Sequence, residues 1–225
     1  MKNVIIFGAS GSIGNFIFNS LDKKEYNIIG TSSSQEKCIE GIVYVTNDFL
    51  DNLKSINKID IIIWTQGHNF NDNIQNFNYS KFQQIIDINV SFILNTLQSI
   101  VDKINNGGKL VIISSIWEEF TRENKLSYSI SKSALSGLVK NLACNLSSRN
   151  ILVNNVLPGV IDNEMTRTTL DEEKLEYLKN YTNFNRLVTL EDVYETVLFL
   201  VSKNTGITGQ SIKVDLGFTN IHNYR

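Results

Sequence analysis

Short apolar runs alternate with helix-like patterns along the whole chain. Runs with the length of a buried strand occur at Asn3–Phe7, Tyr26–Thr31, Ile42–Val45, Asp60–Trp64, Lys109–Ser114, Leu152–Val156 and Ser211–Val214. Between them, apolar positions recur with helical spacing at about Ser12–Leu21, Asp48–Ile56, Tyr79–Ile104, Ser127–Ser148 and Leu190–Val201. We expect Asn106-Gly107-Gly108 to end the third of these helices as a C-cap.

This alternation predicts an α/β fold. Strands that are apolar throughout are typical of a parallel sheet covered by helices on both faces. Residues 1–225 show no linker and no internal repeat, and Pro158 is the single proline. We therefore expect a single doubly wound, Rossmann-type domain with a seven-stranded parallel sheet. The polar, helix-prone stretch after Pro158-Gly159 predicts a substrate lid at about residues 160–188.

Composition narrows the function classes. The 225 residues are 42% hydrophobic, which is enough for one sizeable core. Lys+Arg 21 against Asp+Glu 23 gives a net charge of −2, which argues against a nucleic-acid partner. Cys38 and Cys144 lie far apart and are expected to be reduced thiols, and polar residues interrupt the most apolar helix pattern, Ile85–Val101. We expect a cytoplasmic protein with no membrane span and no metal site.

A glycine-rich turn follows the first predicted strand. The segment reads Val4-Ile5-Ile6-Phe7-Gly8-Ala9-Ser10-Gly11-Ser12-Ile13-Gly14, and a helical pattern begins at its end. Glycine allows a tight turn and a close approach of the backbone to a pyrophosphate, and the new helix offers free N–H groups to the phosphates. The turn predicts a dinucleotide site, although a glycine triplet is also compatible with a flexible loop.

Tyr128 and Lys132 are spaced by one helical turn and follow Ser115. Residues i and i+4 of a helix share a face, so a cation there favours the phenolate of a tyrosine and lowers its pKa. A serine hydroxyl nearby would hold the substrate oxygen while the phenol transfers a proton. Taken alone, such a pair is also typical of an ordinary helix surface.

Further segments follow these in a definite order. They are Asp48-Phe49-Leu50-Asp51, Ile86-Asp87-Ile88-Asn89-Val90, Gly107–Ser115, Tyr128-Ser129-Ile130-Ser131-Lys132, Asn154–Ile161, Arg186 before Glu191-Asp192-Val193, and Thr208-Gly209-Gln210 leading to Asp215-Leu216-Gly217. With the glycine turn, they make the chain resemble the short-chain dehydrogenase/reductase family from Val4 to Thr219.

The resemblance implies an NAD(P)(H)-dependent oxidoreductase that interconverts a carbonyl and an alcohol by hydride transfer. It implies Tyr128 as general acid/base, Ser115 as the residue that binds the substrate oxygen, and Lys132 as the cation that lowers the pKa of Tyr128. Asn89 would hold a water that connects Lys132 to solvent, while its alternative is a satisfied polar group in a helix kink. The expected cofactor-binding residues are Gly8, Ser10, Gly11, Ser12, Ile13, Gly14, Ser32, Ser33, Asp48, Phe49, Gly67, Tyr128, Lys132, Pro158, Gly159 and Ile161.

Two departures from the family pattern leave alternatives open. The spacing of Gly8, Gly11 and Gly14 is that of extended and atypical members, which favours a nucleotide-sugar epimerase or dehydratase as an alternative. The family's Asn-Asn-Ala-Gly is replaced by Trp64-Thr65-Gln66-Gly67, where we expect Trp64 to pack under the sheet. His68 follows and either faces solvent or contacts substrate. A non-catalytic NADP(H) sensor is a further alternative, although sensors tend to lose the Tyr and Lys.

The end of the second strand bears on the choice of cofactor. It reads Gly30-Thr31-Ser32-Ser33-Ser34, with no carboxylate to repel a 2′-phosphate and with hydroxyls that can bind one. Lys37 is the nearest cation. We therefore expect NADP(H) to be favoured over NAD(H).

The substrate is expected to be a small carbonyl or alcohol compound. Residues that would line the lid are Asn163, Glu164, Met165, Tyr177, Tyr181 and Phe184, and Trp117, Glu118 and Glu119 follow Ser115. The two glutamates either favour a cationic group of the substrate or face water. We also expect a homodimer or homotetramer, because the second long helix carries more apolar residues than one core face requires. These residues are Leu135, Leu138, Val139, Leu142 and Leu146.

Overall fold

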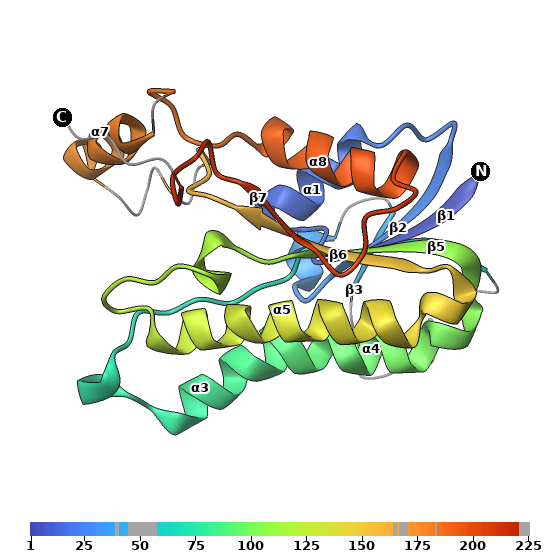
Figure 1. The fold of residues 1–225 in the computed structure, drawn as a ribbon, viewed down its shortest axis with the longest axis horizontal. Coiled ribbons are helices and arrows are strands. Elements are labelled where there is room, and N and C mark those ends of the chain that lie inside the picture. The colour runs from blue at the N-terminus through green and yellow to red at the C-terminus, as the bar shows by residue number, and fades with distance from the viewer. Residues whose placement is uncertain (39–40, 45–57, 164–165, 167–170, 183, 221–225) are drawn as a thin grey trace.

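The chain folds around one parallel β-sheet. A computed structural model describes residues 1–38, 41–44, 58–163, 166, 171–182 and 184–220. The sheet has seven strands in the order β3-β2-β1-β4-β5-β6-β7, and all neighbours are parallel (Figure 1). The strands are β1 (Lys2–Phe7), β2 (Tyr26–Ser32), β3 (Ile42–Tyr44), β4 (Ile59–Trp64), β5 (Ile104–Ile113), β6 (Leu152–Pro158) and β7 (Ser211–Val214). The predicted fold class is confirmed.

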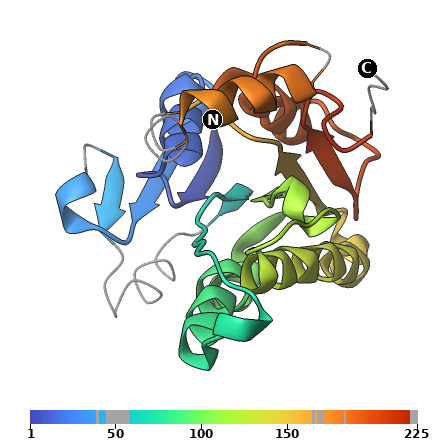
Figure 2. The ribbon, with the colours of Figure 1, turned by 90° about the vertical axis from the view of Figure 1, so that its left-hand side faces the viewer.

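Helices cover both faces of this sheet (Figure 2). On one face lie α1 (Ser12–Ser20) and α8 (Leu190–Ser202); on the other lie α3 (Tyr79–Ile86), α4 (Phe92–Ile100) and α5 (Leu126–Asn145). The helix α7 (Glu172–Tyr181) lies at the periphery, beyond the carboxyl ends of the strands. Short turns of other helix types are η1 (Gln35–Lys37), η2 (Ile74–Asn76), η3 (Asp87–Ser91), η4 (Val101–Lys103), η5 (Ile116–Glu118) and η6 (Ser147–Arg149).

Alternation along each strand divides the apolar residues between two cores. Val4 and Ile6 pack with residues of α1 and α8, whereas Ile5 and Phe7 pack with residues of α4 and α5. Successive side chains of a strand point to opposite faces, so a strand covered on both faces must be apolar at every position. This is why the central strands β1 and β4 are largely apolar runs in the sequence. Within the described chain, no helix has the length and apolar character needed to cross a membrane.

The long helix expected over Tyr79–Ile104 is wrong in its details. It consists of α3, the π-helical turn η3 and α4, and the strand β5 already begins at Ile104. Asn106-Gly107-Gly108 therefore lies within β5 and is not a C-cap. Ile104 pairs with Ile59, and the pairing resumes at Lys109 after an irregularity that Gly107 enables with a φ of +81°. The predicted helix Asp48–Ile56 and the final residue of the predicted strand Ile42–Val45 lie outside the described residues.

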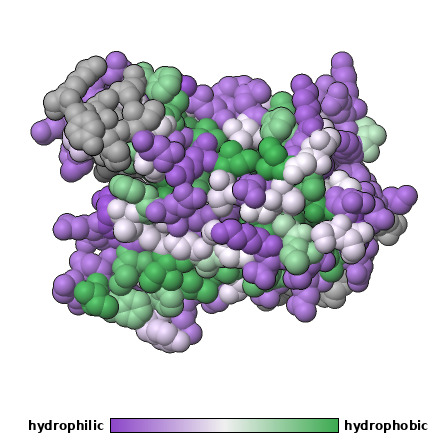
Figure 3. Space-filling model, in the orientation of Figure 1, coloured by the Kyte–Doolittle hydropathy of each residue, from purple (hydrophilic) through white to green (hydrophobic). Residues whose placement is uncertain are grey.

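The apolar residues of α5 that were predicted to offer an oligomer interface pack into the core of the single chain. Leu135, Val139, Leu142 and Leu146 are buried under β5 and β6, and Leu138 packs against the same cluster. A helix of an open sheet must bury one full apolar face, and these residues supply it. Apolar surface gathers toward the lower left of the face in Figure 3, over α5 and α3. Exposed large apolar residues in or beside η2, α3, α4 and α5 include Ile74, Phe77, Tyr79, Leu94 and Ile130.

Candidate active site

The glycine turn joins β1 to α1 at the carboxyl edge of the sheet. Gly8 adopts a φ of +78°, and a Cβ on it would lie 2.7 Å from the backbone nitrogen of Gln66. A Cβ on Gly14 would lie 2.4 Å from both Gly8 O and Thr65 Oγ1, so only glycine fits there. Gly11 has ordinary backbone angles and more room, and therefore only the outer two glycines are required by sterics. The predicted strand–turn–helix is confirmed.

This turn fits a dinucleotide for two structural reasons. No described side chain caps the N-terminus of α1, whose first N–H groups therefore remain available to a phosphate. The side-chain Nε2 and Oε1 atoms of Gln66, next to Gly8, are buried and form no hydrogen bond with the described residues. Orphaned buried polar atoms are costly unless a ligand or water satisfies them. Sequence reasoning named the Trp64–Gly67 segment but missed Gln66 as a candidate contact.

The serines at the end of β2 differ in accessibility. Ser32 is buried, and its Oγ lies 2.8 Å from Ser10 Oγ and 3.0 Å from the Ser34 backbone nitrogen. Ser33 is exposed. Of the two predicted contacts for the cofactor 2′ group, Ser33 is thus the accessible one, while Ser32 holds the turn in shape. The side chain of Lys37, and both Asp48 and Phe49, lie outside the described part of the structure.

Ser115, Tyr128 and Lys132 lie close together at the carboxyl end of β5. Ser115 directly follows the strand and begins η5, while Tyr128 and Lys132 lie one turn apart on α5. Lys132 Nζ lies 5.7 Å from the centroid of the Tyr128 ring and donates a 3.1 Å hydrogen bond to the carbonyl oxygen of Ile113. The side chains of Ser115 and Lys132 are buried, and Tyr128 is partly buried. The sequence-predicted trio therefore forms one cluster.

The electrostatics of this cluster differ from the sequence-based expectation. Burial raises the pKa of Tyr128 to about 12, and a hydrogen bond with the Ser115 side chain opposes that rise. Burial lowers the pKa of Lys132 to about 8, opposed by the charge of Glu118. The expectation that Lys132 brings the pKa of Tyr128 below its ordinary value is wrong, because desolvation disfavours the phenolate and dominates the shift.

Asn89 occupies the π-helical turn η3 and faces the same cluster. Its Nδ2 donates to the His68 backbone oxygen at 3.0 Å and to Ser131 Oγ at 2.9 Å, and its Oδ1 accepts from the His68 backbone N–H at 2.8 Å. A Cβ on Gly67 would lie 3.7 Å from Asn89 Oδ1 and from Lys132 Nζ. The structure thus brings Gly67, Asn89 and Lys132 together, as the sequence predicted, while the His68 side chain is exposed.

Trp64 confirms its predicted packing under the sheet. Its side chain is fully buried and stacks on Phe7 with ring centroids 5.7 Å apart. Its Nε1 donates to Thr96 Oγ1 at 3.0 Å. Thr65 Oγ1 donates to the Phe7 backbone oxygen at 2.8 Å, so this segment ties β4 to the start of the glycine turn.

The Pro-Gly segment lies at the other side of the sheet edge. Pro158 ends β6, the Gly159 backbone nitrogen donates to Val214 O at 2.9 Å, and Ile161 forms a β-bridge with Val188. A Cβ on Gly159 would lie 3.0 Å from the Cα of Asp215, which explains the glycine. The predicted cofactor contacts Pro158, Gly159 and Ile161 thus lie at and after the end of β6. In the sheet order, β1 and β4 separate them from the end of β2.

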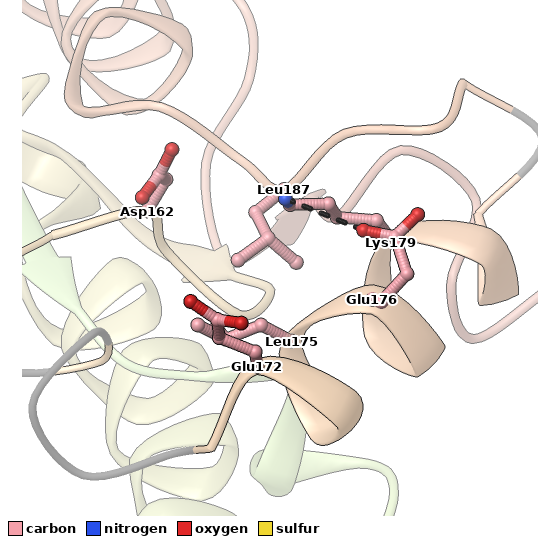
Figure 4. Close-up of a pocket in the computed structure, with 6 residues that line it drawn as sticks. All are labelled: Asp162, Glu172, Leu175, Glu176, Lys179 and Leu187. Carbon is pink, nitrogen blue, oxygen red and sulfur yellow. Dashed lines mark ion pairs between the residues drawn. The ribbon is translucent and has the colours of Figure 1, made fainter.

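The predicted lid contains a cavity of about 440 Å³ between α7, Asp162 before it and Leu187 after it (Figure 4). Leu175 and Leu187 line its middle, Asp162 and Glu172 one side, and the Glu176–Lys179 ion pair the other. None of the catalytic candidates is among its described lining residues. Of the predicted lid contacts, Tyr177 and Phe184 are exposed, and Glu164, Met165 and the Tyr181 side chain lie outside the described residues.

Two charged residues near the cluster are unexpectedly buried: Lys125, which was not predicted as a site residue, and Glu118, which was predicted to line the substrate site. Lys125 is buried, donates from Nζ to Asn69 Oδ1 at 3.0 Å, and lies 5.5 Å from the centroid of the Tyr128 ring. Glu118 is also buried, although the sequence placed it only near the substrate. Neither shows a distinctive sequence spacing, so only the tertiary structure reveals that they are enclosed.

Comparison with known proteins identifies relatives over nearly the whole chain. Residues 45–219 match the family described as enoyl-(acyl carrier protein) reductase. The chain is 31% identical to the 3-oxoacyl-(acyl-carrier-protein) reductase FabG of Rickettsia bellii, with 96% of both proteins covered. It is 32% identical to the same-named protein of Rickettsia conorii, again with 96% of both covered.

Solved structures share the fold. A short chain dehydrogenase family protein from Francisella tularensis has a TM-score of 0.88 at 23% identity, covering 97% of this chain and 99% of its own. A gluconate 5-dehydrogenase from Burkholderia cenocepacia, in complex with NADP and tartrate, has a TM-score of 0.86 at 19% identity, covering 98% of this chain and 96% of its own.

Proposed function

The chain belongs to the short-chain dehydrogenase/reductase family and is an NAD(P)-dependent oxidoreductase; on that premise, we propose that it interconverts a carbonyl and an alcohol with Tyr128 as the general acid/base. The observation that carries the proposal is the convergence of Ser115, Tyr128 and Lys132 at the carboxyl end of β5. The sheet edge beside them carries the glycine turn that suits a dinucleotide.

Each residue of the cluster has a distinct task. A bound nicotinamide dinucleotide supplies or accepts the hydride. Ser115 holds the substrate oxygen through its hydroxyl, and Tyr128 donates its phenolic proton to that oxygen during reduction and removes it during oxidation. Lys132 places a positive charge beside the phenol and so stabilises the phenolate that remains after proton transfer. Asn89 holds the backbone of His68 and orients Ser131, which fixes the wall of the site next to Lys132.

The protonation states suit Tyr128 as the proton donor in carbonyl reduction. With a pKa of about 12, Tyr128 is a protonated phenol at neutral pH and can donate without prior protonation. Lys132, with a pKa of about 8, is largely charged there. Placing the substrate oxygen within reach of both the Ser115 and Tyr128 hydroxyls stabilises the negative charge that develops on that oxygen.

For the cofactor, we propose NADP(H) over NAD(H). The residues that would hold its adenosine half are the glycine turn, Gln66 and the exposed hydroxyl of Ser33. The end of β2 carries no acidic residue in Gly30–Ser34, so nothing there repels a 2′-phosphate. Ser33→Asp should weaken NADPH binding at least tenfold relative to NADH, read by titration of the reduced cofactor's fluorescence. Equal affinity of the native protein for NADPH and NADH would refute this preference.

For the substrate, we propose a 3-oxoacyl thioester. The support is the name of the relatives that are 31% and 32% identical over 96% of the chain. Acetoacetyl-coenzyme A is a suitable probe, with 5-ketogluconate as the comparison ketone. Turnover of 5-ketogluconate alone would assign the enzyme to sugar acids.

The central experiment follows reduced-cofactor absorbance with these two probes. Tyr128→Phe removes the transferable proton and should lower turnover at least 100-fold, while cofactor affinity stays within twofold of native. The matched control is Tyr79→Phe at the exposed start of α3, which should retain native turnover. Native-level activity in Tyr128→Phe would exclude the proton-donor role.

A further inference from the structure

Glu118 is a buried carboxylate with a well-defined set of partners. Its side chain is only 6% exposed. Oε2 accepts a 3.0 Å hydrogen bond from Asn155 Nδ2, and Oε1 accepts a hydrogen bond from the Ser211 hydroxyl. The backbone oxygen of Glu118 accepts from Ser133 Oγ at 2.8 Å, which ties η5 to α5. Glu118 takes no part in the proposed proton transfer from Tyr128.

The strand register places Glu118 between the sheet and α5. Ile112 of β5 is level with Asn155 of β6, and Asn155 is level with Ser211 of β7. Level residues of neighbouring parallel strands point to the same face, and Ile112 packs into the core beneath α5. Asn155 and Ser211 therefore project toward α5 and hold the Glu118 carboxylate in that layer.

Lys132 enters the same layer from α5. Its Nζ is fixed by the carbonyl oxygen of Ile113, the residue that follows Ile112 in β5. The Glu118 carboxylate is thus held by Asn155, which is level with Ile112, and the Lys132 amine is held by Ile113, the next residue of β5. Both are enclosed, with Lys132 3% exposed, so water screens their interaction weakly.

The other ionisable groups around Glu118 do not neutralise it. Glu119, from the same loop, forms a 2.7 Å ion pair with Lys213 of β7. Tyr128 of α5 is a protonated phenol at neutral pH. The residue of β6 that contacts the Glu118 carboxylate is Asn155, whose side chain is uncharged. Burial raises the pKa of Glu118 and the charge of Glu119 adds to the rise, while side-chain hydrogen bonds, among them that of Ser211, and the charge of Lys132 oppose it.

We infer that Glu118 is a positioning residue whose buried charge keeps the amine of Lys132 protonated beside Tyr128. It acts through Lys132 and touches neither substrate nor the reacting atoms. A buried charge pair is stable only when further hydrogen bonds satisfy the remaining polar atoms, and Asn155 and Ser211 supply them. The inference rests on the proposed role of Lys132, so its test must read the charge of Lys132 directly.

The test is a pH titration of the Lys132 side chain by NMR in protein labelled with carbon-13 at the lysine Cε atoms. The Lys132→Arg spectrum identifies the resonance. Glu118→Gln keeps the shape of the side chain but removes its charge, and the titration midpoint of Lys132 should fall by about one pH unit. The control is Glu119→Gln, which should leave the midpoint unchanged. An unchanged midpoint in Glu118→Gln would overturn the inference.

A reciprocal measurement covers the case in which Glu118→Gln does not fold. Coupling between two sites is symmetric, so removing the cation must shift the acid by the same amount in the opposite direction. In Lys132→Met, the carboxyl carbon resonance of Glu118 should titrate about one pH unit higher than in the native protein. Lys140→Met, on the exposed side of α5, is the control. No shift relative to that control would equally overturn the inference.

These outcomes are separable from failure of the proposed function. Full activity in Tyr128→Phe together with a shifted Lys132 midpoint would refute the proton donor and leave the Glu118–Lys132 coupling standing. Loss of activity in Tyr128→Phe without any midpoint shift would do the reverse.

Discussion

The side chain of Asn89 hydrogen-bonds both backbone groups of His68. Oδ1 accepts from the His68 N–H at 2.8 Å, and Nδ2 donates to the His68 carbonyl oxygen at 3.0 Å. A side-chain amide that pairs with both backbone groups of one residue in this way imitates a strand partner and extends the order of β4 into the segment that follows it. The π-helical turn η3 is what presents the Asn89 side chain to that segment.

Removing this pairing should damage both stability and turnover. Asn89→Ala removes both hydrogen bonds to the His68 backbone and the one that Ser131 Oγ accepts, and should lower the free energy of unfolding by about 3 kcal/mol. Turnover should fall about 100-fold, because the wall beside Lys132 loses its position. Urea unfolding and cofactor absorbance measure the two effects. Asn95→Ala, exposed on α4, should change neither; native turnover in Asn89→Ala would contradict the prediction.

Gly14→Ala tests the steric demand of the glycine turn. The new Cβ would lie 2.4 Å from Gly8 O and Thr65 Oγ1, so the start of α1 must shift. We expect a loss of about 2 kcal/mol in stability and at least a tenfold weaker affinity for NADPH, measured by thermal unfolding and fluorescence titration.

Gly137→Ala is the matched substitution within a helix. Gly137 lies in α5 with no atom within 4 Å of the position that a Cβ would take. Alanine should therefore raise the free energy of unfolding by about 0.5–1 kcal/mol through its better helix propensity, without changing cofactor affinity. Equal effects of the two alanine substitutions would contradict the steric argument.

Thr96→Val tests the hydrogen bond that supports Trp64. Valine keeps the shape of the threonine but leaves the buried indole N–H, now 3.0 Å from Thr96 Oγ1, without an acceptor. The free energy of unfolding should fall by about 2 kcal/mol, as measured by urea unfolding. Thr96→Ser retains the hydroxyl and should lose less. A smaller loss in the valine variant than in the serine variant would show that the hydrogen bond contributes little.

The stability of the protein should depend on pH through Lys132. Burial lowers its pKa from 10.5 to about 8 in the folded protein, so between these values the unfolded chain binds more protons. Stability must therefore rise with pH in that window. Relative to Lys132→Met, the native free energy of unfolding should rise by up to about 3 kcal/mol from pH 7 to pH 10.

The sign reverses for Tyr128 at higher pH. Its pKa is raised from 10.0 to about 12, so above pH 10 the unfolded chain loses its proton first and stability falls. Urea unfolding between pH 7 and pH 10 isolates the lysine, with Lys140→Met as the control that should follow the native curve. Parallel curves for the native protein and Lys132→Met would show that the buried amine is not perturbed.

Much of the fold was predictable from local patterns. The strands β1 and β4 are largely apolar runs because both of their faces are covered, and this signal lies in the sequence itself. The boundary between α4 and β5 was not predictable in the same way. Gly107 resembles a helix stop in the sequence. In the structure, its positive φ allows the irregularity in β5 between Ile104, which pairs with Ile59, and Lys109, where the pairing with β4 resumes.

The sequence alone determined which groups are present and which of them share a helix face, because the spacing of Tyr128 and Lys132 and the order of strand, glycine turn and helix are local properties. Tertiary structure alone decided their electrostatic state. Burial moves the pKa of Tyr128 upward, and the register of β5, β6 and β7 encloses Glu118 with Lys132. Desolvation depends on atoms contributed by distant segments, and spacing along the chain carries no record of them.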